Sequence, residues 1–543
     1  MKLRLAGSML ALCLVACSKS PDTANAPASD ARKAAPAVAA AAVPIVAPQS
    51  AHVDDGIAWR KGDVDAAFAE AKAGNKPVFM YWGAIWCPPC NQVKATIFNR
   101  QDFVERSRFF VPVYIDGDSP HAQKEGARFK VSGYPTMILF KPDGTEITRL
   151  PGEVDADQYM RVLAMGMNGA RPVKATLAAA LSSDRSAGAK LAPEDWRMLS
   201  YYSWISDEQQ LMPKKDVAMT LARLAKACPA DQADTATRLE LQALAIAADA
   251  KGARPRIDQR AADRVIAVLA DARLARENFD TFAYYAGSIA AYLTPAQSAE
   301  RARLIATWNV ALDRFIADTR LATADRLVAV NAKIELARLG APKGTLPDAL
   351  LATVREQVAR ANQEATDVYA RQAVISAAAE VLAEAGLLDL SDALLTKELE
   401  RSHSPYYFML GLAANARKRG DKAGALDWAE KAYAGANGPA TRLQWGVGYV
   451  KNLIELAPQD VARIESAAGQ VIGELEARPE TFYERNRRAL ERMGRELAAW
   501  NKDKAHNDSV QRLRAQMANV CAKLPVADPA RATCDGALRP AKA

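Results

Sequence analysis

Histidine is scarce in this chain, and the few copies are scattered. The 543 residues include only four, none close to another: His52, His121, His403 and His506. The spacing of the cysteines also gives little support for a metal site, because Cys87 and Cys90 are the only cysteines separated by two residues. A structural zinc site usually needs a second such pair or two histidines in addition. These absences argue against a bound zinc ion, and the sequence gives no sign of another metal or of a cofactor.

Two further absences narrow the class of protein. Lys and Arg (71) outnumber Asp and Glu (63), but the two signs are interspersed, and no basic block carries interleaved aromatic residues. Such a block is typical of nucleic-acid binding, so we expect no nucleic-acid partner. Beyond the N-terminus no stretch of 18 uninterrupted apolar residues occurs, so no membrane-spanning helix is expected there. Half of the residues are apolar, which is enough for two or more buried cores.

The N-terminus has the pattern of a targeting signal. Lys2 and Arg4 precede an apolar run that is too short to span a bilayer comfortably and that ends in LVAC at Cys17. This ending resembles the lipobox of bacterial lipoproteins. The resemblance implies that residues 1–16 are a signal peptide and that Cys17 is lipidated. Because Ser18 rather than Asp follows, it also favours the outer membrane. An ordinary secretory signal cleaved elsewhere is the alternative.

Residues 17–52 differ in composition from the rest of the chain. Ala, Pro, Ser, Asp and Lys dominate this segment, and its prolines prevent a long helix. We interpret it as a semi-extended tether between the lipid and the folded protein. A transmembrane anchor is the alternative, but Pro44 and Pro48 interrupt a run that is mostly alanine.

Residues 53–168 alternate between strand and helix patterns. The central strands are continuous apolar runs, so helices should cover both faces of their sheet. The acidic residue at the start of the last segment is a typical helix cap. The pattern predicts an α/β domain with a strand at 57–60, a helix at 63–74, a strand at 76–83, a helix after Cys87, a strand at 108–118, a helix at 121–131, a hairpin at 136–152 and a helix at 155–167.

The cysteine pair lies where the strand at 76–83 gives way to a helix. Cys87 is at the mouth of that helix, and Pro89 falls in its first turn, where a missing N–H has no cost. The helix dipole and the free N–H groups favour a thiolate, so the pKa of Cys87 should fall from about 8.5 towards about 3.5–7.5. Cys90 lies one turn further in. We expect Cys87 to be an accessible nucleophile and Cys90 to resolve its mixed disulfides. A permanently oxidised structural disulfide is the alternative.

The element order, the sequence WCPPC at the strand–helix junction and the sequence GYPT before the fourth strand resemble the thioredoxin superfamily. The resemblance is strongest to periplasmic thiol:disulfide interchange members. It implies disulfide exchange with Cys87 and Cys90 as the catalytic pair. It also implies that Trp86 packs over the pair and contacts substrate, although plain core packing is an alternative. Pro135 matches the cis-proline that faces the disulfide, which would let Tyr134 pair its backbone with a substrate strand.

Two positions depart from the cytosolic thioredoxin pattern. Tyr81 stands six residues before the first cysteine, where those proteins carry a buried acid that moves protons to and from the second cysteine. Asn91 rather than a basic residue follows Cys90. Proton transfer at Cys90 therefore needs water, or an acid such as Asp116 or Glu125 if the fold brings one near.

From residue 171 to residue 543 the strand signals vanish. Ala, Leu and charged residues recur at helical spacing, and Gly, Pro and Asn punctuate the chain as between paired antiparallel helices. The segments around Gly386 and Gly420 resemble tetratricopeptide-type repeats, and the two glycines are separated by one length of such a repeat. We expect an all-α, solenoid-like helical-repeat domain over 171–543. A non-repeating helical bundle is the alternative.

The remaining cysteines divide into two groups. We expect Cys13 to be removed with the signal peptide. Cys228 continues an apolar helical stripe, so we expect a buried, inert thiol there. Cys521 and Cys534 flank a loop with two prolines. In an oxidising compartment we expect them to form a structural disulfide. A second redox pair is the alternative.

These patterns together predict a lipid-anchored thiol:disulfide oxidoreductase of the bacterial envelope, on the periplasmic side of the membrane. Its partners would be exported proteins that carry thiols or disulfides, and the helical domain would recruit or orient them. The sequence does not fix the redox direction. A reductase would need electrons from an inner-membrane partner, and an oxidase would need a quinone-linked one. The competing hypothesis is a helical scaffold whose thioredoxin-like unit serves mainly as an interaction module.

Overall fold

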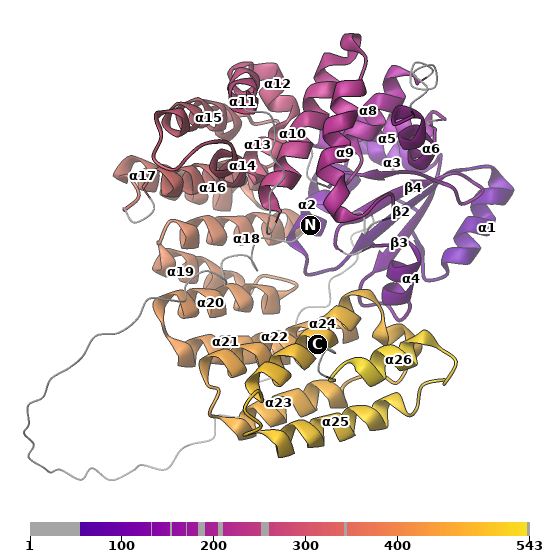
Figure 1. Cartoon of the computed structure of the whole chain (residues 1–543), viewed down its shortest axis with the longest axis vertical. Coiled ribbons are helices and arrows are strands. Elements are labelled where there is room, and N and C mark those ends of the chain that lie inside the picture. The colour runs from indigo at the N-terminus through magenta and orange to yellow at the C-terminus, as the bar shows by residue number, and fades with distance from the viewer. Residues whose placement is uncertain are drawn as a thin grey trace, which may run out of the picture.

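The computed structural model describes residues 55–131, 133–152, 155–169, 171–182, 191–204, 210–250, 260–341 and 345–539. The predicted signal peptide, tether and lipidated Cys17 lie outside these residues. The described chain forms an α/β domain followed by a long helical region, as the sequence predicts (Figure 1). Within the described residues no helix is both long and apolar enough to cross a membrane.

The α/β domain is built on one five-stranded sheet with the order β1-β3-β2-β4-β5. β1, β3 and β2 are parallel, and β4 and β5 run antiparallel to β2 and to each other. Its elements are β1 (Arg60–Lys61), α1 (Val64–Gly74), β2 (Val78–Gly83), α2 (Pro88–Val93), the π-helix η2 (Lys94–Phe98), α3 (Gln101–Ser107), β3 (Val111–Asp116), α4 (Ala122–Arg128), β4 (Thr136–Phe140), β5 (Glu146–Leu150) and α5 (Ala156–Met167).

Two details of this domain differ from the sequence prediction. The first strand is shorter and later than expected, because only Arg60 and Lys61 pair with β3. The segment after Cys87 is not one regular helix: α2 passes into the π-helical turn η2, and α3 starts separately at Gln101. The elements otherwise follow the predicted order.

Helices cover both faces of the sheet. Val78, Met80 and Trp82 of β2 share a buried core with α1, and this core continues into the helical region. The alternate residues Phe79 and Tyr81 face the other side, where they pack with residues of η2, α3 and α5. Every residue of β2 is buried, because a strand covered on both sides has no solvent face.

The helical region starts beside the α/β domain, where α6 (Val173–Ala180) contacts β5 and α8 (Pro193–Tyr201) packs on α5. It then arcs around that domain, packs on α2 through α18 (Val368–Glu384) and reaches α4 at η4 (Pro479–Phe482) and α24 (Glu484–Trp500) (Figure 1). Its elements are α6 (Val173–Ala180), α8 (Pro193–Tyr201), α9 (Lys214–Ala227), η3 (Ala230–Gln232), α10 (Ala233–Asp249), α11 (Ala261–Ala270), α12 (Ala272–Glu277), α13 (Phe279–Tyr284), α14 (Ala286–Leu293), α15 (Ala299–Ala317), α16 (Thr323–Gly340), α17 (Asp348–Glu364), α18 (Val368–Glu384), α19 (Leu388–Glu398), α20 (Pro405–Arg419), α21 (Lys422–Gly435), α22 (Pro439–Leu456), α23 (Val461–Gly473), η4 (Pro479–Phe482), α24 (Glu484–Trp500), α25 (Asn507–Cys521) and α26 (Pro529–Gly536).

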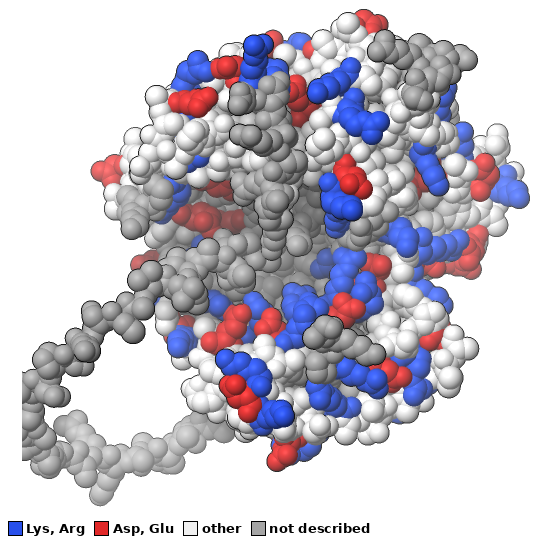
Figure 2. Space-filling model, in the orientation of Figure 1, with Lys and Arg blue, Asp and Glu red and all other residues white. Residues whose placement is uncertain are grey.

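Successive helices of this region pack as pairs. Gly386 lies between α18 and α19, and Gly420 lies between α20 and α21, and each adopts a positive φ that suits glycine. The two turns therefore close two neighbouring helical pairs. On the visible face, Lys and Arg lie among Asp and Glu over most of the surface (Figure 2). This mixture agrees with the even spacing of charges along the chain.

Candidate redox-active site

The first cysteine of the pair is the N-cap of α2. The backbone of Cys87 is extended, its Sγ accepts a hydrogen bond from the Cys90 N–H at 3.4 Å, and two prolines, Pro88 and Pro89, fill the first helical positions. Both thiols are free in this structure. The strand-to-helix junction therefore places one sulfur at a helix N-terminus and the other one turn later.

The loop before β4 lies beside this junction. The Tyr134–Pro135 peptide bond is cis, and the next residue, Thr136, pairs with Trp82 at the end of β2. The rings of Trp86 and Tyr134 are 6.4 Å apart. The fold thus brings together five residues that the sequence places in two separate motifs: Trp86, Cys87, Cys90, Tyr134 and Pro135.

The expected accessibility of the nucleophile is not present in this arrangement. Cys87 is 2% exposed and Cys90 is fully buried. Burial raises the pKa of the Cys87 thiol well above its usual value, although the Cys90 N–H and the positive charge of Arg485 act in the opposite direction. The prediction of an exposed thiolate with a lowered pKa is therefore wrong for this structure, because burial outweighs the hydrogen bond from the Cys90 N–H and the charge of Arg485.

The helical region is what buries the site. The Trp86 ring stacks on the Tyr407 ring of α20, with centroids 5.7 Å apart. It also contacts the Trp445 ring of α22 in an edge-to-face arrangement, with centroids 4.7 Å apart. The indole N–H of Trp86 donates to Oγ1 of Thr441 at 2.8 Å. Trp86 thus has an aromatic and hydrogen-bonded environment made largely by residues that are distant in the sequence.

The backbone before Cys87 is also engaged by the helical region. Nε2 of His403 lies 3.0 Å from the carbonyl oxygen of Ile85, and Nε2 of Gln372 donates to the carbonyl oxygen of Trp86 at 3.3 Å. Sequence patterns carried no signal for these contacts, since a buried polar residue on a helix does not reveal which distant loop it faces.

Two residues lie behind the second cysteine. The Tyr81 ring stacks on Tyr114 at 5.3 Å, and burial together with the neighbouring Cys90 raises the pKa of the Tyr81 phenol well above its usual value. Lys94 follows Cys90 by one helical turn, and its ammonium lies 5.1 Å from the centroid of the Tyr369 ring. Burial lowers the pKa of Lys94, and the charge of Cys90 opposes that shift. The sequence analysis missed Lys94, although its spacing of four from Cys90 was a usable signal.

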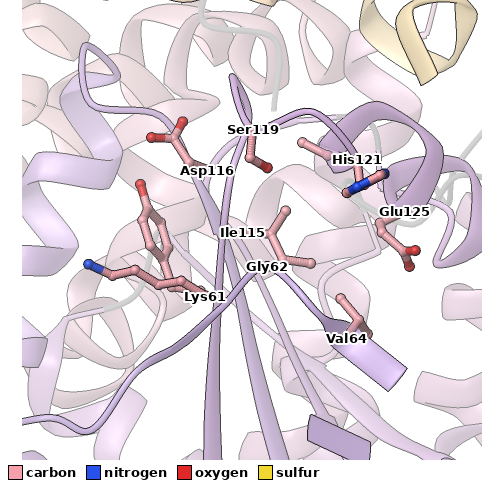
Figure 3. Close-up of a pocket in the computed structure, with 10 residues that line it drawn as sticks. Lys61, Gly62, Val64, Ile115, Asp116, Ser119, His121 and Glu125 are labelled. Atoms are coloured by element: carbon pink, nitrogen blue, oxygen red, sulfur yellow. The ribbon is translucent and has the colours of Figure 1, made fainter. Parts of the chain in front are cut away.

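The two acids proposed as proton acceptors for Cys90, Asp116 and Glu125, line one cavity but belong to different elements. Both line a cavity of about 220 Å³ beside β1 and β3 (Figure 3). Asp116 ends β3 opposite Gly83 of β2, and its charge acts on Lys94. Glu125 points away from Asp116 in this cavity and pairs with Arg128 at 3.4 Å. Of the two, Asp116 acts electrostatically on Lys94 and Tyr114, the same groups on which Cys90 acts.

The other cysteines lie apart from this site. Cys521 and Cys534 form a disulfide between α25 and α26 with an S–S distance of 1.91 Å. Cys228 is half-buried rather than buried, since it follows the last residue of α9, and burial raises its pKa to about 11. Among the residues that the structure describes, no group of three or more His, Cys, Asp or Glu side chains is arranged to hold a metal ion.

Comparison with known proteins gives matches to the α/β domain. The thioredoxin-like domain family matches residues 64–166. The thiol:disulfide interchange protein DsbD of Pseudomonas fluorescens is 28% identical over 103 residues, which are 18% of this chain and 18% of that protein. Thioredoxin of Mycobacterium tuberculosis is 34% identical over 102 residues, which are 18% of this chain and 83% of that protein.

A solved structure of a thioredoxin from Thermus thermophilus matches with 24% identity and a TM-score of 0.19, and the match covers 20% of this chain and 86% of that one. The chain spans less than a fifth of the length of the interchange proteins that it matches. It spans more than four fifths of the mycobacterial thioredoxin.

Proposed function

Because the chain belongs to the thioredoxin family through residues 64–166, we propose that it exchanges thiols and disulfides with client proteins through Cys87 and Cys90. The observation that carries this proposal is the juxtaposition of a cysteine at a helix N-terminus with the loop of cis-Pro135. A helix N-terminus stabilises a thiolate once the site is open to water.

The exchange needs only the two sulfurs and a client. The Cys87 thiolate attacks a client disulfide, forms a mixed disulfide and releases the second client sulfur as a thiolate. Cys90 then loses its proton and attacks Sγ of Cys87, which releases the first client sulfur and leaves a Cys87–Cys90 disulfide. Two electrons pass from the pair to the client, so a dithiol protein must reduce the pair again. The reverse sequence oxidises a client dithiol.

The residues around the pair have distinct roles in this proposal. The backbone at Tyr134 and cis-Pro135 pairs with the client strand that carries the reacting cysteine. Trp86 covers the sulfur pair and contacts the client. Lys94 stabilises negative charge on Cys90 while that sulfur attacks, because a half-buried ammonium one turn away acts through a medium of low dielectric constant.

We place this activity in the bacterial cell envelope. The lipobox-like ending at Cys17 supports a lipid anchor at the outer membrane. The similarity to interchange proteins supports the periplasmic side. Exported proteins with thiols or disulfides are then the clients, and an inner-membrane redox protein is the electron partner.

Trapping of mixed disulfides tests the proposal. A full-length Cys90→Ser variant, expressed with its N-terminal segment, should accumulate covalent complexes with envelope proteins that a reductant dissolves, because the resolving sulfur is absent. The matched control is the Cys87→Ser/Cys90→Ser double variant, which should give none. If neither variant forms thiol-linked complexes, disulfide exchange on protein clients is excluded.

The burial of both sulfurs favours a second candidate, a helical scaffold whose thioredoxin-like domain acts as an interaction module. The same pair of variants separates the two functions. Recovery of identical partners from the double variant, without any disulfide-linked species in Cys90→Ser, would support the scaffold. Partners that depend on Cys87 would support the oxidoreductase.

A further inference from the structure

We propose that the helical region is a built-in competitor for the client-binding face of the redox domain, held in place by a latch between Asp118 and Thr441. The latch joins the turn after β3 to the first turn of α22. Oδ1 of Asp118 accepts the Thr441 backbone N–H at 2.7 Å, and Oδ2 accepts the Thr441 hydroxyl at 2.6 Å. This proposal rests on the proposed disulfide exchange, since it concerns access to the same two sulfurs.

Asp118 supplies the cap that α22 lacks. The N-cap residue of α22 is Gly438, which has no side chain to bond the free N–H groups of the first turn. The carboxylate of Asp118, which comes from the redox domain, does this instead, and a negative charge is favourable at a helix N-terminus. A Cβ at Gly438 would lie 2.3 Å from Cγ of Asp118, and Gly438 has a positive φ of 85°. The approach of the carboxylate therefore requires glycine at this position.

The latch is connected directly to the redox motif. Trp86 donates its indole N–H to the Thr441 hydroxyl, and that hydroxyl donates to Asp118. One threonine thus bonds both the aromatic residue beside Cys87 and the carboxylate that anchors α22. Tyr407 and Trp445 flank the Trp86 ring, which is 8% exposed. Trp86 cannot turn towards a client while this arrangement persists.

The cis-proline loop is covered by the same region. The backbone N–H of Arg485, in the first turn of α24, donates to Oε1 of Gln123 at 3.1 Å. Gln123 in turn donates to the Tyr134 hydroxyl at 3.1 Å. The guanidinium of Arg485 lies 4.7 Å from the centroid of the Tyr134 ring. Both loops that a thioredoxin fold offers to a client strand are therefore engaged by helices of the same chain.

These contacts explain how a buried sulfur can belong to a working exchange site. A client polypeptide must reach Cys87 and the Tyr134–Pro135 backbone at once, and the closed state leaves Cys87 only 2% exposed. Separation of α18, α20, α22 and α24 from the redox domain would expose both. The partner that fits this face is hence a polypeptide strand able to replace the contacts of Trp86 and Tyr134. The helical region lowers the apparent affinity of any client that cannot replace these contacts.

The experiment measures access to Cys87 in the reduced full-length protein, with Cys228→Ser as the background to remove the free thiol that lies outside the Cys87–Cys90 pair in the described part of the chain. The rate of alkylation by iodoacetamide reports access, and the rate of exchange with a disulfide-bonded peptide reports function. Thr441→Val removes the shared hydroxyl and should speed alkylation about tenfold, since it deletes one buried and one partly buried hydrogen bond, the second of them to a carboxylate. Thr441→Ser keeps the hydroxyl and should stay near the parent rate.

The control and the second variant keep the outcome interpretable. Thr396→Val alters an exposed threonine of α19, and it should change neither rate. If Thr441→Val does not fold, Asp118→Ala breaks the latch from the redox domain and should give the same increase. If the rate of alkylation is unchanged in both latch variants while peptide exchange is still measurable, the proposal that the helical region competes with clients is wrong. The proposed disulfide exchange is then unaffected. Faster alkylation without any peptide exchange confirms the latch and overturns the proposed function.

Discussion

Replacement of Asp325 by asparagine should remove a pH dependence from the stability of the protein. Asp325 lies on α16, is 4% exposed and accepts a hydrogen bond at 2.7 Å from Gln92 of the redox domain. Burial raises its pKa from 3.8 to about 7; the charge of Asp155 also raises it, while Gln92 and Arg276 lower it. The side chain of asparagine is neutral at every pH, and its oxygen can still accept from Gln92.

The sign follows from the binding of the proton. The folded protein holds the proton of Asp325 more tightly than the unfolded chain does. The contribution of this protonated carboxyl to the free energy of unfolding is therefore complete below about pH 4. The stabilisation is lost as the pH rises to about 7. The raised pKa corresponds to about 4 kcal/mol as an upper limit, of which about 2–3 kcal/mol falls between about pH 5 and about pH 7. Above about pH 7 the variant should be more stable than the parent protein.

Guanidinium chloride unfolding, followed by tryptophan fluorescence at pH 5, 6, 7 and 8, measures this difference. The quantity of interest is the unfolding free energy of Asp325→Asn minus that of the parent at each pH, because other groups titrate equally in both. It should rise with pH and level off above pH 7. The exposed Asp503→Asn variant serves as the control and should give a flat difference. A flat line for Asp325→Asn would refute the assignment of a buried, protonated carboxyl.

Two further outcomes can be measured in the same protein. Lys94→Met should slow the resolution of a Cys87 mixed disulfide about tenfold at pH 7, because the charge nearest to Cys90 along the helix is lost; Lys94→Arg should retain most of the rate, and equal rates for all three proteins would exclude a role for this charge. Removal of the disulfide by Cys521→Ala/Cys534→Ala should lower the free energy of unfolding by about 3 kcal/mol, the loop-closure value for a bridge with a sequence separation of 13. Peptide exchange should be unchanged in that variant, and a loss of exchange would show that this pair takes part in electron transfer.

The α/β domain could be predicted because its signals are local. The apolar run at 76–83 indicated a buried strand, and the order of strands and helices followed from alternating patterns. The acidic cap at Asp155 holds in the structure, where its carboxylate accepts the N–H groups of Asp157 and Gln158. Each of these features depends on residues within one or two turns of each other, which is the range that a sequence pattern covers.

The state of the candidate site could not be predicted in the same way. The position of Cys87 at a helix N-terminus is local and was found, but its exposure depends on Tyr407, Thr441 and Trp445, which lie far later in the chain. In the sequence these three are ordinary residues of amphipathic helices. Hydrophobic periodicity tells which face of a helix is buried, and it does not tell which partner buries it.

The cap that Asp118 provides for α22 carries an evolutionary signature. Relatives that keep this closed form should retain a short acidic residue at 118, glycine at 438 and a hydroxyl at 441 as a set, since a side chain at 438 would collide with the carboxylate. A lineage that loses one of the three gains nothing by keeping the others. Covariation of positions 118, 438 and 441 would therefore distinguish, in genome sequences alone, proteins that close over their cysteines from those that stay open.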